Sequence, residues 1–270
     1  MYPLGFSERE QRRLALQDRL FAPFTRALLL EAGLAPGMTV LDVGAGVGDV
    51  SLLAAQLVGA EGSVTAVEQS GAYVRAAQRR ATDRGCAQIE FIIADLQDFA
   101  PARRYDAIVG RFILEWLPNP TSALRRLSTF VRPGGVLVFQ EYDHPMHEGQ
   151  HSYPVAPFFE HVLARCIDAL EASGLHRRMG AQLRGCFLGA GLPEPALRLD
   201  AAIGGGPEWE AYAWLAAGAA SIAQRLTDPA LAAAAGDLAS LTDRLRADVT
   251  AQSSVAQLAP LVGAWARTPP

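Results

Sequence analysis

The feature that most constrains this chain is a glycine-rich turn at 44–48, with the sequence GAGVG, set between two apolar segments. A run rich in β-branched residues precedes the turn, and an apolar-periodic segment at 47–58 follows it. This order predicts a buried strand, a tight turn and a helix. Gly44 and Gly46 allow positive φ angles and a close approach of a ligand to the main chain, and Gly48 allows the helix to lie near the sheet. The first N–H groups of that helix favour an anionic group over the turn.

Three acidic residues near the turn indicate which ligand it holds. The glycine spacing departs from the G-x-G-x-x-G of dinucleotide-binding proteins, because Asp49 occupies the place of the third glycine. A carboxylate there has the wrong charge to face a pyrophosphate, whereas Asp42 in the preceding strand suits a ligand with a positive group. Glu68, at the end of a second strand pattern, is placed to accept hydrogen bonds from ribose hydroxyls. We therefore expect a ligand with a ribose, a carboxylate and a cation but no phosphate, which describes S-adenosylmethionine.

Strand and helix patterns alternate through the first half of the chain. Strands are predicted at 38–43, 63–68, 89–94, 105–110 and 135–142, and helices at 47–58, 70–84 and about 120–131. Such alternation predicts a parallel sheet with helices on both faces. Ligands of such sheets bind outside the carboxyl ends of the strands, so the residues that close each strand are candidate site residues.

The ordered segments resemble the class I S-adenosylmethionine-dependent methyltransferases, in particular their bacterial small-molecule branch. The resemblance covers roughly 36–143 and is carried by the stretches 40–49, 64–70, 91–95, 105–111 and 132–139. It implies an α/β fold with a doubly wound, mostly parallel seven-stranded sheet of the Rossmann-like methyltransferase type. It also implies S-adenosyl-L-methionine as the cofactor.

The resemblance implies cofactor-binding roles for residues at the strand ends. Asp95 would accept a hydrogen bond from the adenine amino group, and Leu96 would donate its backbone N–H to the ring; their alternative roles are a turn-forming acid and a core leucine. Asp42 either orients the methionine amine or stabilises the glycine turn. Arg111 either reaches the methionine carboxylate or pairs with Glu115. The predicted cofactor-binding residues are Asp42, Gly44, Ala45, Gly46, Glu68, Gln69, Asp95, Leu96 and Arg111.

The segment 142–151 carries three of the five histidines and follows the last strand of the predicted core. Methyl transfer from a sulfonium needs positioning first, and a hydroxyl or amine acceptor also needs a base with a pKa near neutral. The predicted catalytic residues are His144 and, after it, His147; solvated surface histidines are the alternative. No metal site is predicted, because Pro145 and Gly149 disfavour a single helix that would direct all three imidazoles to one zinc ion.

Both ends of the chain are predicted to form helical covers. The predicted domains are an N-terminal helical cap at 1–35, a cofactor-binding core at 36–206, a helical lid insertion at 207–253 and a final strand at 254–270. The cap is predicted as two helices separated near Pro23, and the lid as two alanine-rich helices at 208–226 and 229–247. The final strand is expected at the antiparallel edge of the sheet.

Composition and charge exclude several classes of partner. The formal net charge is −4 and no run of Lys or Arg exceeds two residues, which argues against a nucleic-acid partner. The three cysteines are widely spaced, which favours a reducing compartment, and no apolar run is long enough to span a membrane. We therefore predict a cytoplasmic enzyme with a small-molecule acceptor and no nucleic-acid or membrane partner. A homodimer is compatible with this prediction.

The predicted function is S-adenosylmethionine-dependent methyl transfer to a small organic acceptor, with oxygen favoured over nitrogen or carbon. Aromatic residues near the start of the lid favour an apolar or aromatic acceptor; they are Trp209, Tyr212 and Trp214. Two alternatives stay open. One is a cyclase or isomerase that uses the sulfonium without methyl transfer, and the other is a non-catalytic partner protein that holds the cofactor.

Overall fold

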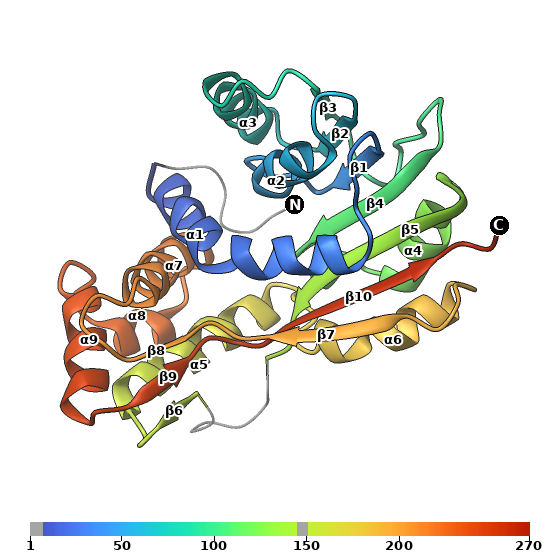
Figure 1. Cartoon of the computed structure of the whole chain (residues 1–270). Coiled ribbons are helices and arrows are strands. Elements are labelled where there is room, and N and C mark those ends of the chain that lie inside the picture. The colour runs from blue at the N-terminus through green and yellow to red at the C-terminus, as the bar shows by residue number, and fades with distance from the viewer. Residues whose placement is uncertain (1–7, 145–150) are drawn as a thin grey trace. The chain divides into compact units, whose positions relative to one another are not determined.

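The computed structural model describes residues 8–144 and 151–270, which group into two compact units (Figure 1). The sheet unit comprises 22–142, 179–199 and 261–270, and the described residues of the helical unit are 8–21, 143–144, 151–178 and 200–260. Within the described ranges, no helix has the length and apolar character needed to cross a membrane.

The sheet unit is built on seven strands in the order β3-β2-β1-β4-β5-β10-β7 (Figure 1). Neighbours among the first five strands pair in parallel, whereas β10 runs antiparallel to β5. This arrangement confirms the predicted doubly wound, mostly parallel sheet. The strands are β1 Thr39–Val43, β2 Ser63–Glu68, β3 Ile89–Ile93, β4 Tyr105–Arg111, β5 Val131–Tyr142, β7 Ala196–Asp200 and β10 Leu261–Arg267.

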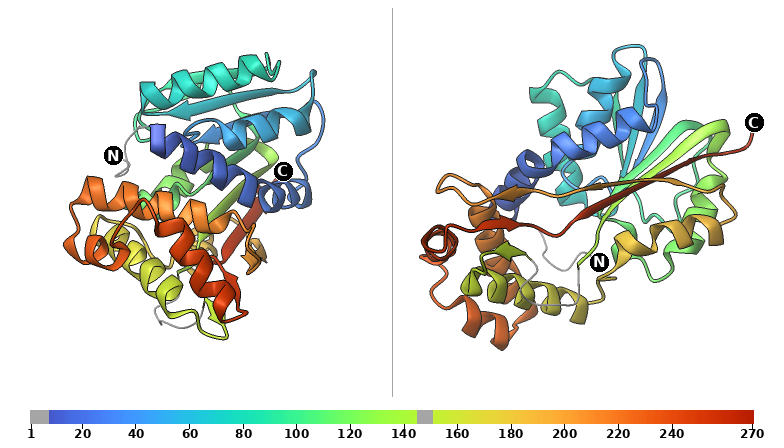
Figure 2. Two further views of the ribbon diagram at one scale, coloured as in Figure 1. Left: turned by 90° about the vertical axis from the view of Figure 1, so that its left-hand side faces the viewer. Right: turned by 60° about the horizontal axis from the view of Figure 1, so that its bottom comes forward.

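Helices cover both faces of the central strands of this sheet (Figure 2). Val40 faces a cluster that includes residues of α1 and α2, while the next residue, Leu41, faces a cluster that includes residues of α4 and α6. Successive strand residues point to opposite faces, so a strand covered on both sides must be apolar at nearly every position. The helices are α1 Glu8–Glu31, α2 Asp49–Val58, α3 Gly71–Asp83, α4 Pro120–Ser128 and α6 Met179–Gly189, with a short 3-10 helix, η1 Leu114–Trp116.

The helical unit combines helices with a small sheet. Its helices are α5 Pro157–Ala172, α7 Ala211–Leu226, α8 Pro229–Ala235 and α9 Leu241–Ala251, together with the first part of α1. A three-stranded sheet of order β6-β9-β8 is formed by Ser152–Tyr153, Val255–Gln257 and Ile203–Gly204. Phe159 and Tyr212 are fully buried.

The last strand was predicted at the edge of the sheet, and this position is wrong. β10 lies between β5 and β7, so β7 is the edge strand, although the predicted antiparallel direction of β10 is confirmed. Ala264 and Ala266 of β10 are buried, whereas Leu197 and Leu199 of β7 are 50% and 69% exposed. The apolar character of β10 therefore fits an interior strand, and an edge strand tolerates the exposed leucines.

Two predicted helix boundaries also differ from the structure. α1 is one continuous helix that contains Pro23, because buried residues on both sides of the proline favour helix continuation over its cost of about 3 kcal/mol. The predicted helix at 229–247 is instead divided into α8 and α9, since Gly236 has a φ of 60° and ends α8. Residues 143–144 and 151–178, which the sequence places in the predicted core, group with the helical unit.

Candidate cofactor site

The glycine turn between β1 and α2 has the backbone that its sequence predicts. Gly44, Gly46 and Gly48 have φ angles of 70°, 54° and 83°. A Cβ atom on Gly44 would lie 2.7 Å from Ile113 Cδ1, and one on Gly48 would lie 3.1 Å from the Cβ of Ala77 in α3. A Cβ atom on Gly46 would meet no described atom within 4 Å. Gly44 and Gly48 therefore serve close packing, and Gly46 leaves its side of the turn open.

Glu68 connects the end of β2 to the glycine turn. Its Oε2 accepts the backbone N–H of Gly46 at 3.0 Å, and its Oε1 accepts that of Ser70 at 2.8 Å. The backbone N–H of Ala45 in turn donates to the carbonyl of Val67 at 3.0 Å. Each carboxylate oxygen keeps a further lone pair, so the group can accept hydrogen bonds from a ribose while it holds the turn. The adjacent Gln69, also predicted in the site, is exposed.

Asp42 lies beneath the turn and is almost completely buried, at 1% exposure. Its Oδ2 accepts a hydrogen bond from Ser51 Oγ at 2.5 Å, in the first turns of α2. Burial raises the pKa of Asp42 to about 7, and the bond from Ser51 together with the charge of Arg111 opposes that rise. This contact supports the alternative in which Asp42 stabilises the glycine turn.

Arg111, at the end of β4, pairs with Asp49 and not with Glu115. Its Nη2 lies 3.3 Å from Asp49 Oδ2, and its Nη1 donates to Thr25 Oγ1 at 3.1 Å. Arg80 of α3 binds the other oxygen of Asp49 at 2.5 Å. The predicted alternative pairing of Arg111 with Glu115 is therefore wrong, because two arginines converge on the first residue of α2.

This arrangement corrects one step of the sequence argument. From the sequence, the carboxylate of Asp49 has the wrong charge to face a pyrophosphate. The charge is instead compensated by Arg80 and Arg111, and the carboxylate is buried at 8% exposure. The charge of Asp49 alone therefore does not exclude a dinucleotide as the ligand of the turn. No local pattern marks Arg80 or Thr25 as partners, because both are distant from the turn in sequence.

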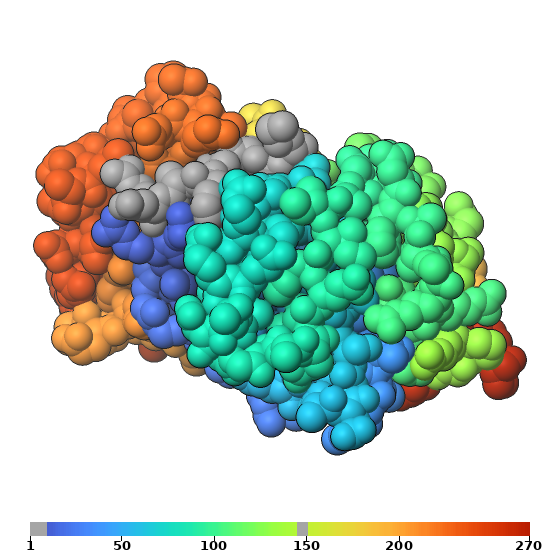
Figure 3. All heavy atoms as spheres, turned by 90° about the horizontal axis from the view of Figure 1, so that it is seen from above, coloured from blue at the N-terminus to red at the C-terminus, as the bar shows by residue number. Residues whose placement is uncertain are grey.

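The segment that follows β3 forms a turn around Asp95. The Oδ1 of this exposed acid accepts the backbone N–H of Gln97 at 2.8 Å, and its carbonyl accepts the N–H groups of Asp98 and Phe99 at 3.1 and 2.9 Å. Leu96, the second predicted adenine contact, is half-buried within the turn. The stretch from α3 to this turn lies on the face shown in Figure 3. The Asp95 side chain is exposed, so a ligand amino group can reach its carboxylate.

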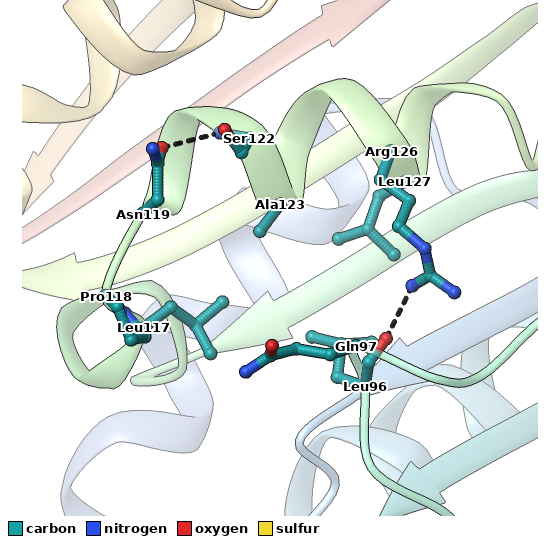
Figure 4. Close-up of a pocket in the computed structure, with 9 residues that line it drawn as sticks. All are labelled: Leu96, Gln97, Leu117, Pro118, Asn119, Ser122, Ala123, Arg126 and Leu127. Carbon is teal, nitrogen blue, oxygen red and sulfur yellow. Dashed lines mark hydrogen bonds between the residues drawn. The ribbon is translucent and has the colours of Figure 1, made fainter.

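A cavity of about 290 Å³ lies between this turn and α4 (Figure 4). Arg126 of α4 reaches across to the turn, where its Nη1 donates to the carbonyl of Leu96 at 2.5 Å. Sequence reasoning missed this residue, and no local pattern would have shown it. The cavity is lined by Leu96, Gln97, Leu117, Pro118, Asn119, Ser122, Ala123, Arg126 and Leu127.

The predicted catalytic histidines fall in different places. His144 belongs to the helical unit, and its backbone N–H donates to the carbonyl of Arg177 at 2.9 Å. Burial lowers the pKa of His144 to about 3, so its imidazole is neutral at pH 7 and only weakly basic. His147 lies outside the described residues. No group of three or more metal-ligating side chains is found within 8–144 and 151–270.

Comparisons with known proteins identify the family of the chain. Residues 34–182, more than half of the chain, match a family model described as a methyltransferase domain. The ubiquinone/menaquinone biosynthesis C-methyltransferase UbiE of Shewanella sp. (strain ANA-3) is 27% identical over 148 residues, which cover 52% of this chain and 59% of that protein. The trans-aconitate 2-methyltransferase of Azoarcus sp. (strain BH72) is 33% identical over 132 residues, which cover 48% of this chain and 50% of that protein.

The fold also occurs in a solved structure with little sequence similarity. The [4+2]-cyclase SpnF aligns with a TM-score of 0.54 and 20% identity, over 93% of this chain and 81% of that chain. This likeness shows the fold alone, and the chain spans only about half to three-fifths of the length of the two curated relatives. The family match, by contrast, covers the glycine turn and every predicted cofactor-binding residue. The chain therefore belongs to the class I S-adenosylmethionine-dependent methyltransferases, whose cofactor is S-adenosyl-L-methionine.

Proposed function

We propose that this chain transfers the methyl group of S-adenosylmethionine to a small organic acceptor. The observation that carries the proposal is the arrangement at the carboxyl ends of three adjacent parallel strands, β1, β2 and β3. β1 ends at the open glycine turn, and β2 ends at Glu68, which accepts a hydrogen bond from that turn. β3 is followed by the exposed carboxylate of Asp95. These groups match a nucleoside that carries hydroxyl and amino donors.

The bound cofactor supplies an electrophilic methyl group on a sulfonium, so the protein must mainly align the acceptor. Glu68 accepts a hydrogen bond from the glycine turn, and Asp42 accepts one from Ser51 in the helix that follows. These bonds hold the turn in place as the binding site for the methionine and ribose portions. Arg111 is a further candidate for the methionine carboxylate, although two of its nitrogens already contact Asp49 and Thr25. His144 is the candidate base, and its low pKa favours acceptors that need little help in losing a proton.

We infer that the acceptor is apolar or aromatic, with oxygen as the favoured methyl-accepting atom. Support comes from an aromatic cluster in the helical unit, where the Trp209 ring lies 6.2 Å from Phe159 and 5.3 Å from Tyr212 between centroids. The names of the two curated relatives include a C-methyltransferase and a trans-aconitate methyltransferase, so they do not select one acceptor atom. The cytoplasmic location remains a prediction from composition.

Turnover with methyl-labelled S-adenosylmethionine and a panel of phenols, carboxylic acids and amines tests the proposal. Label in the product together with S-adenosylhomocysteine is the expected result. Substrate conversion without S-adenosylhomocysteine would replace the proposal with a cyclase or isomerase. Cofactor binding without turnover on any acceptor would favour the non-catalytic partner protein.

The cofactor seat is tested separately by calorimetry with S-adenosylhomocysteine and with NAD. Glu68→Ala and Asp95→Ala should each weaken S-adenosylhomocysteine binding by about 1–3 kcal/mol, because each removes hydrogen bonds to the nucleoside. Unchanged affinity in both variants, or tight NAD binding by the unaltered protein, would contradict the assignment of these acids.

A further inference from the structure

We propose that Arg126 is a positioning residue that sets the recognition of the adenine base. The inference rests on the proposed cofactor site, in which the turn after β3 presents Asp95 and Leu96 to that base. Arg126 would act through the turn and would not touch the ligand. Its role is to hold the peptide groups of the turn in the orientation that distinguishes adenine from other bases.

The turn has only short-range bonds of its own. Asp95 closes it at one end, where its Oδ1 accepts the N–H of Gln97 and its carbonyl accepts those of Asp98 and Phe99. These bonds use the carbonyl and one carboxylate oxygen of Asp95, and they involve neither the Leu96 carbonyl nor the Phe99 carbonyl. The Asp95 carbonyl shares its peptide group with the Leu96 N–H, so these bonds orient that N–H. The next peptide group, which carries the Leu96 carbonyl, depends on what binds that carbonyl.

Packing holds only the inner side of the turn, where Phe99 belongs to a buried cluster with residues of α4 and Leu96 packs against that cluster. The cavity of about 290 Å³ separates it from α4 and from the loop around Leu117, and the labelled side chains in Figure 4 surround this space without filling it. Dispersion contacts are therefore missing only on the side of the turn that faces the cavity. Polar contacts from α4 to the turn supplement the packing on this side.

Arg126 makes those contacts with both ends of its guanidinium. Nη1 donates to the carbonyl of Leu96 at 2.5 Å, and Nη2 donates to the carbonyl of Phe99. The guanidinium also lies 5.2 Å from the centroid of the Phe130 ring. Because the guanidinium is planar and charged, two such bonds fix both carbonyls relative to each other more strongly than a single neutral donor would.

The same helix provides a matched control. Arg125 also donates to a backbone carbonyl, since its Nη2 lies 2.5 Å from the oxygen of Gly189 in α6. It therefore repeats the kind of bond that Arg126 makes, but with a part of the sheet unit outside the turn. Arg126→Gln removes the charged guanidinium that binds the two carbonyls of the turn, and Arg126→Lys keeps the charge without the paired N–H groups. Arg125→Gln controls for the loss of an arginine–carbonyl bond from α4.

The experiment measures dissociation constants by calorimetry for S-adenosylhomocysteine and for its inosine analogue, in which the amino group of the base is replaced by a carbonyl oxygen. We expect Arg126→Gln to weaken S-adenosylhomocysteine binding about tenfold and to reduce the preference for adenine over hypoxanthine by a similar factor. Arg126→Lys should restore part of the preference, and Arg125→Gln should keep the full preference. In turnover, KM for S-adenosylmethionine should rise while kcat at saturation stays unchanged.

The outcomes separate this inference from the proposed function. An unaltered protein that fails to bind S-adenosylhomocysteine would remove the proposed function itself, whereas one that binds it without base preference would remove the roles of Asp95 and Leu96. An unchanged base preference in both Arg126 variants, or an equal loss for both ligands, would overturn the role of Arg126 alone. Should Arg126→Gln fail to fold by circular dichroism, the Arg126→Lys ratio decides.

Discussion

Glu115 and Glu141 form a buried pair of carboxyl groups in the sheet unit. Glu141 accepts the backbone N–H groups of Ile113, Leu114 and Glu115 at 3.2, 3.0 and 3.3 Å, and so caps η1. The carboxyl of Glu115 in turn accepts the backbone N–H of Tyr142 and a bond from the Trp116 side chain. Burial raises the pKa of both groups, that of Glu141 to about 8. At neutral pH the Glu141 carboxyl therefore favours its protonated form.

This pair predicts a pH dependence of stability. Because the pKa of Glu141 rises from its usual 4.5 to about 8 on folding, the folded protein binds the proton more tightly than the unfolded chain, and stability falls as pH rises across that range. Glu115→Gln removes one carboxyl of the pair. We expect the variant to gain roughly 1 kcal/mol, or about 3 °C in melting temperature, relative to the unaltered protein at pH 8.5 and little at pH 5. Thermal unfolding followed by circular dichroism across pH measures this.

The exposed Glu61 supplies the control for that measurement. Glu61→Gln should leave the pH profile of the melting temperature unchanged. A Glu115→Gln variant that is equally destabilised at pH 5 and pH 8.5 would show that the carboxyl pair does not govern the profile.

His144 allows a second prediction at the level of a single residue. Burial lowers its pKa to about 3, so its imidazole stays neutral across the usual assay range. We expect His144→Ala to leave the dissociation constant of S-adenosylhomocysteine unchanged, because no predicted cofactor-binding residue belongs to the helical unit. If His144 is the base, kcat should fall about 10²-fold or more. Full activity of the variant would dismiss this role, and an altered cofactor affinity would contradict the separation of the two sites.

The strand–turn–helix element β1–α2 gives a prediction that compares two glycines. Gly46 and Gly48 both have positive φ, but only at Gly48 would a Cβ atom be crowded, 3.1 Å from Ala77. Gly48→Ala should therefore cost more stability, about 2 kcal/mol or more, whereas Gly46→Ala should cost about 1 kcal/mol through backbone strain alone. Urea unfolding of both variants measures the difference.

The same two variants separate stability from ligand binding. Since the open side of the turn lies at Gly46, Gly46→Ala should weaken S-adenosylhomocysteine binding more than its effect on stability suggests. Equal stability losses in the two variants would contradict the packing argument, and unchanged affinity in Gly46→Ala would contradict the ligand approach.

Sequence reasoning succeeded for elements whose signals are local. The glycine turn, the strands predicted at 63–68 and 105–110 and the direction of β10 follow from alternation, apolar runs and turn residues within short windows. It failed where a long-range contact decides. Arg111 meets Asp49 across 62 positions and Arg126 meets Leu96 across 30 positions. The partners of each pair are too far apart in sequence for a local pattern to link them. The neutralisation of the Asp49 charge and the bonds of Arg126 to the turn after β3 therefore could not be predicted.

At the scale of the whole molecule, the predicted cofactor-binding residues and the predicted base belong to different units. Every predicted cofactor-binding residue belongs to the sheet unit, and His144 belongs to the helical unit. We expect S-adenosylhomocysteine to slow amide hydrogen exchange most in the segments 44–48, 68–70 and 95–99, because ligand contacts and the bonds of Glu68 and Asp95 lie there. Hydrogen exchange followed by mass spectrometry, with and without ligand, measures the effect. Protection confined to the helical unit would contradict the assigned cofactor seat.

The interior place of β10 has a consequence for how the chain acquires its fold. Leu261 pairs with Tyr142, so β5 keeps one side unpaired until more than a hundred further residues have been made. During synthesis, the apolar strand β5 therefore has unpaired backbone N–H and C=O groups on one side until β10 is made. An unpaired apolar strand is prone to aggregation. The last strand of this sheet to be synthesised is therefore one that lies between two earlier strands.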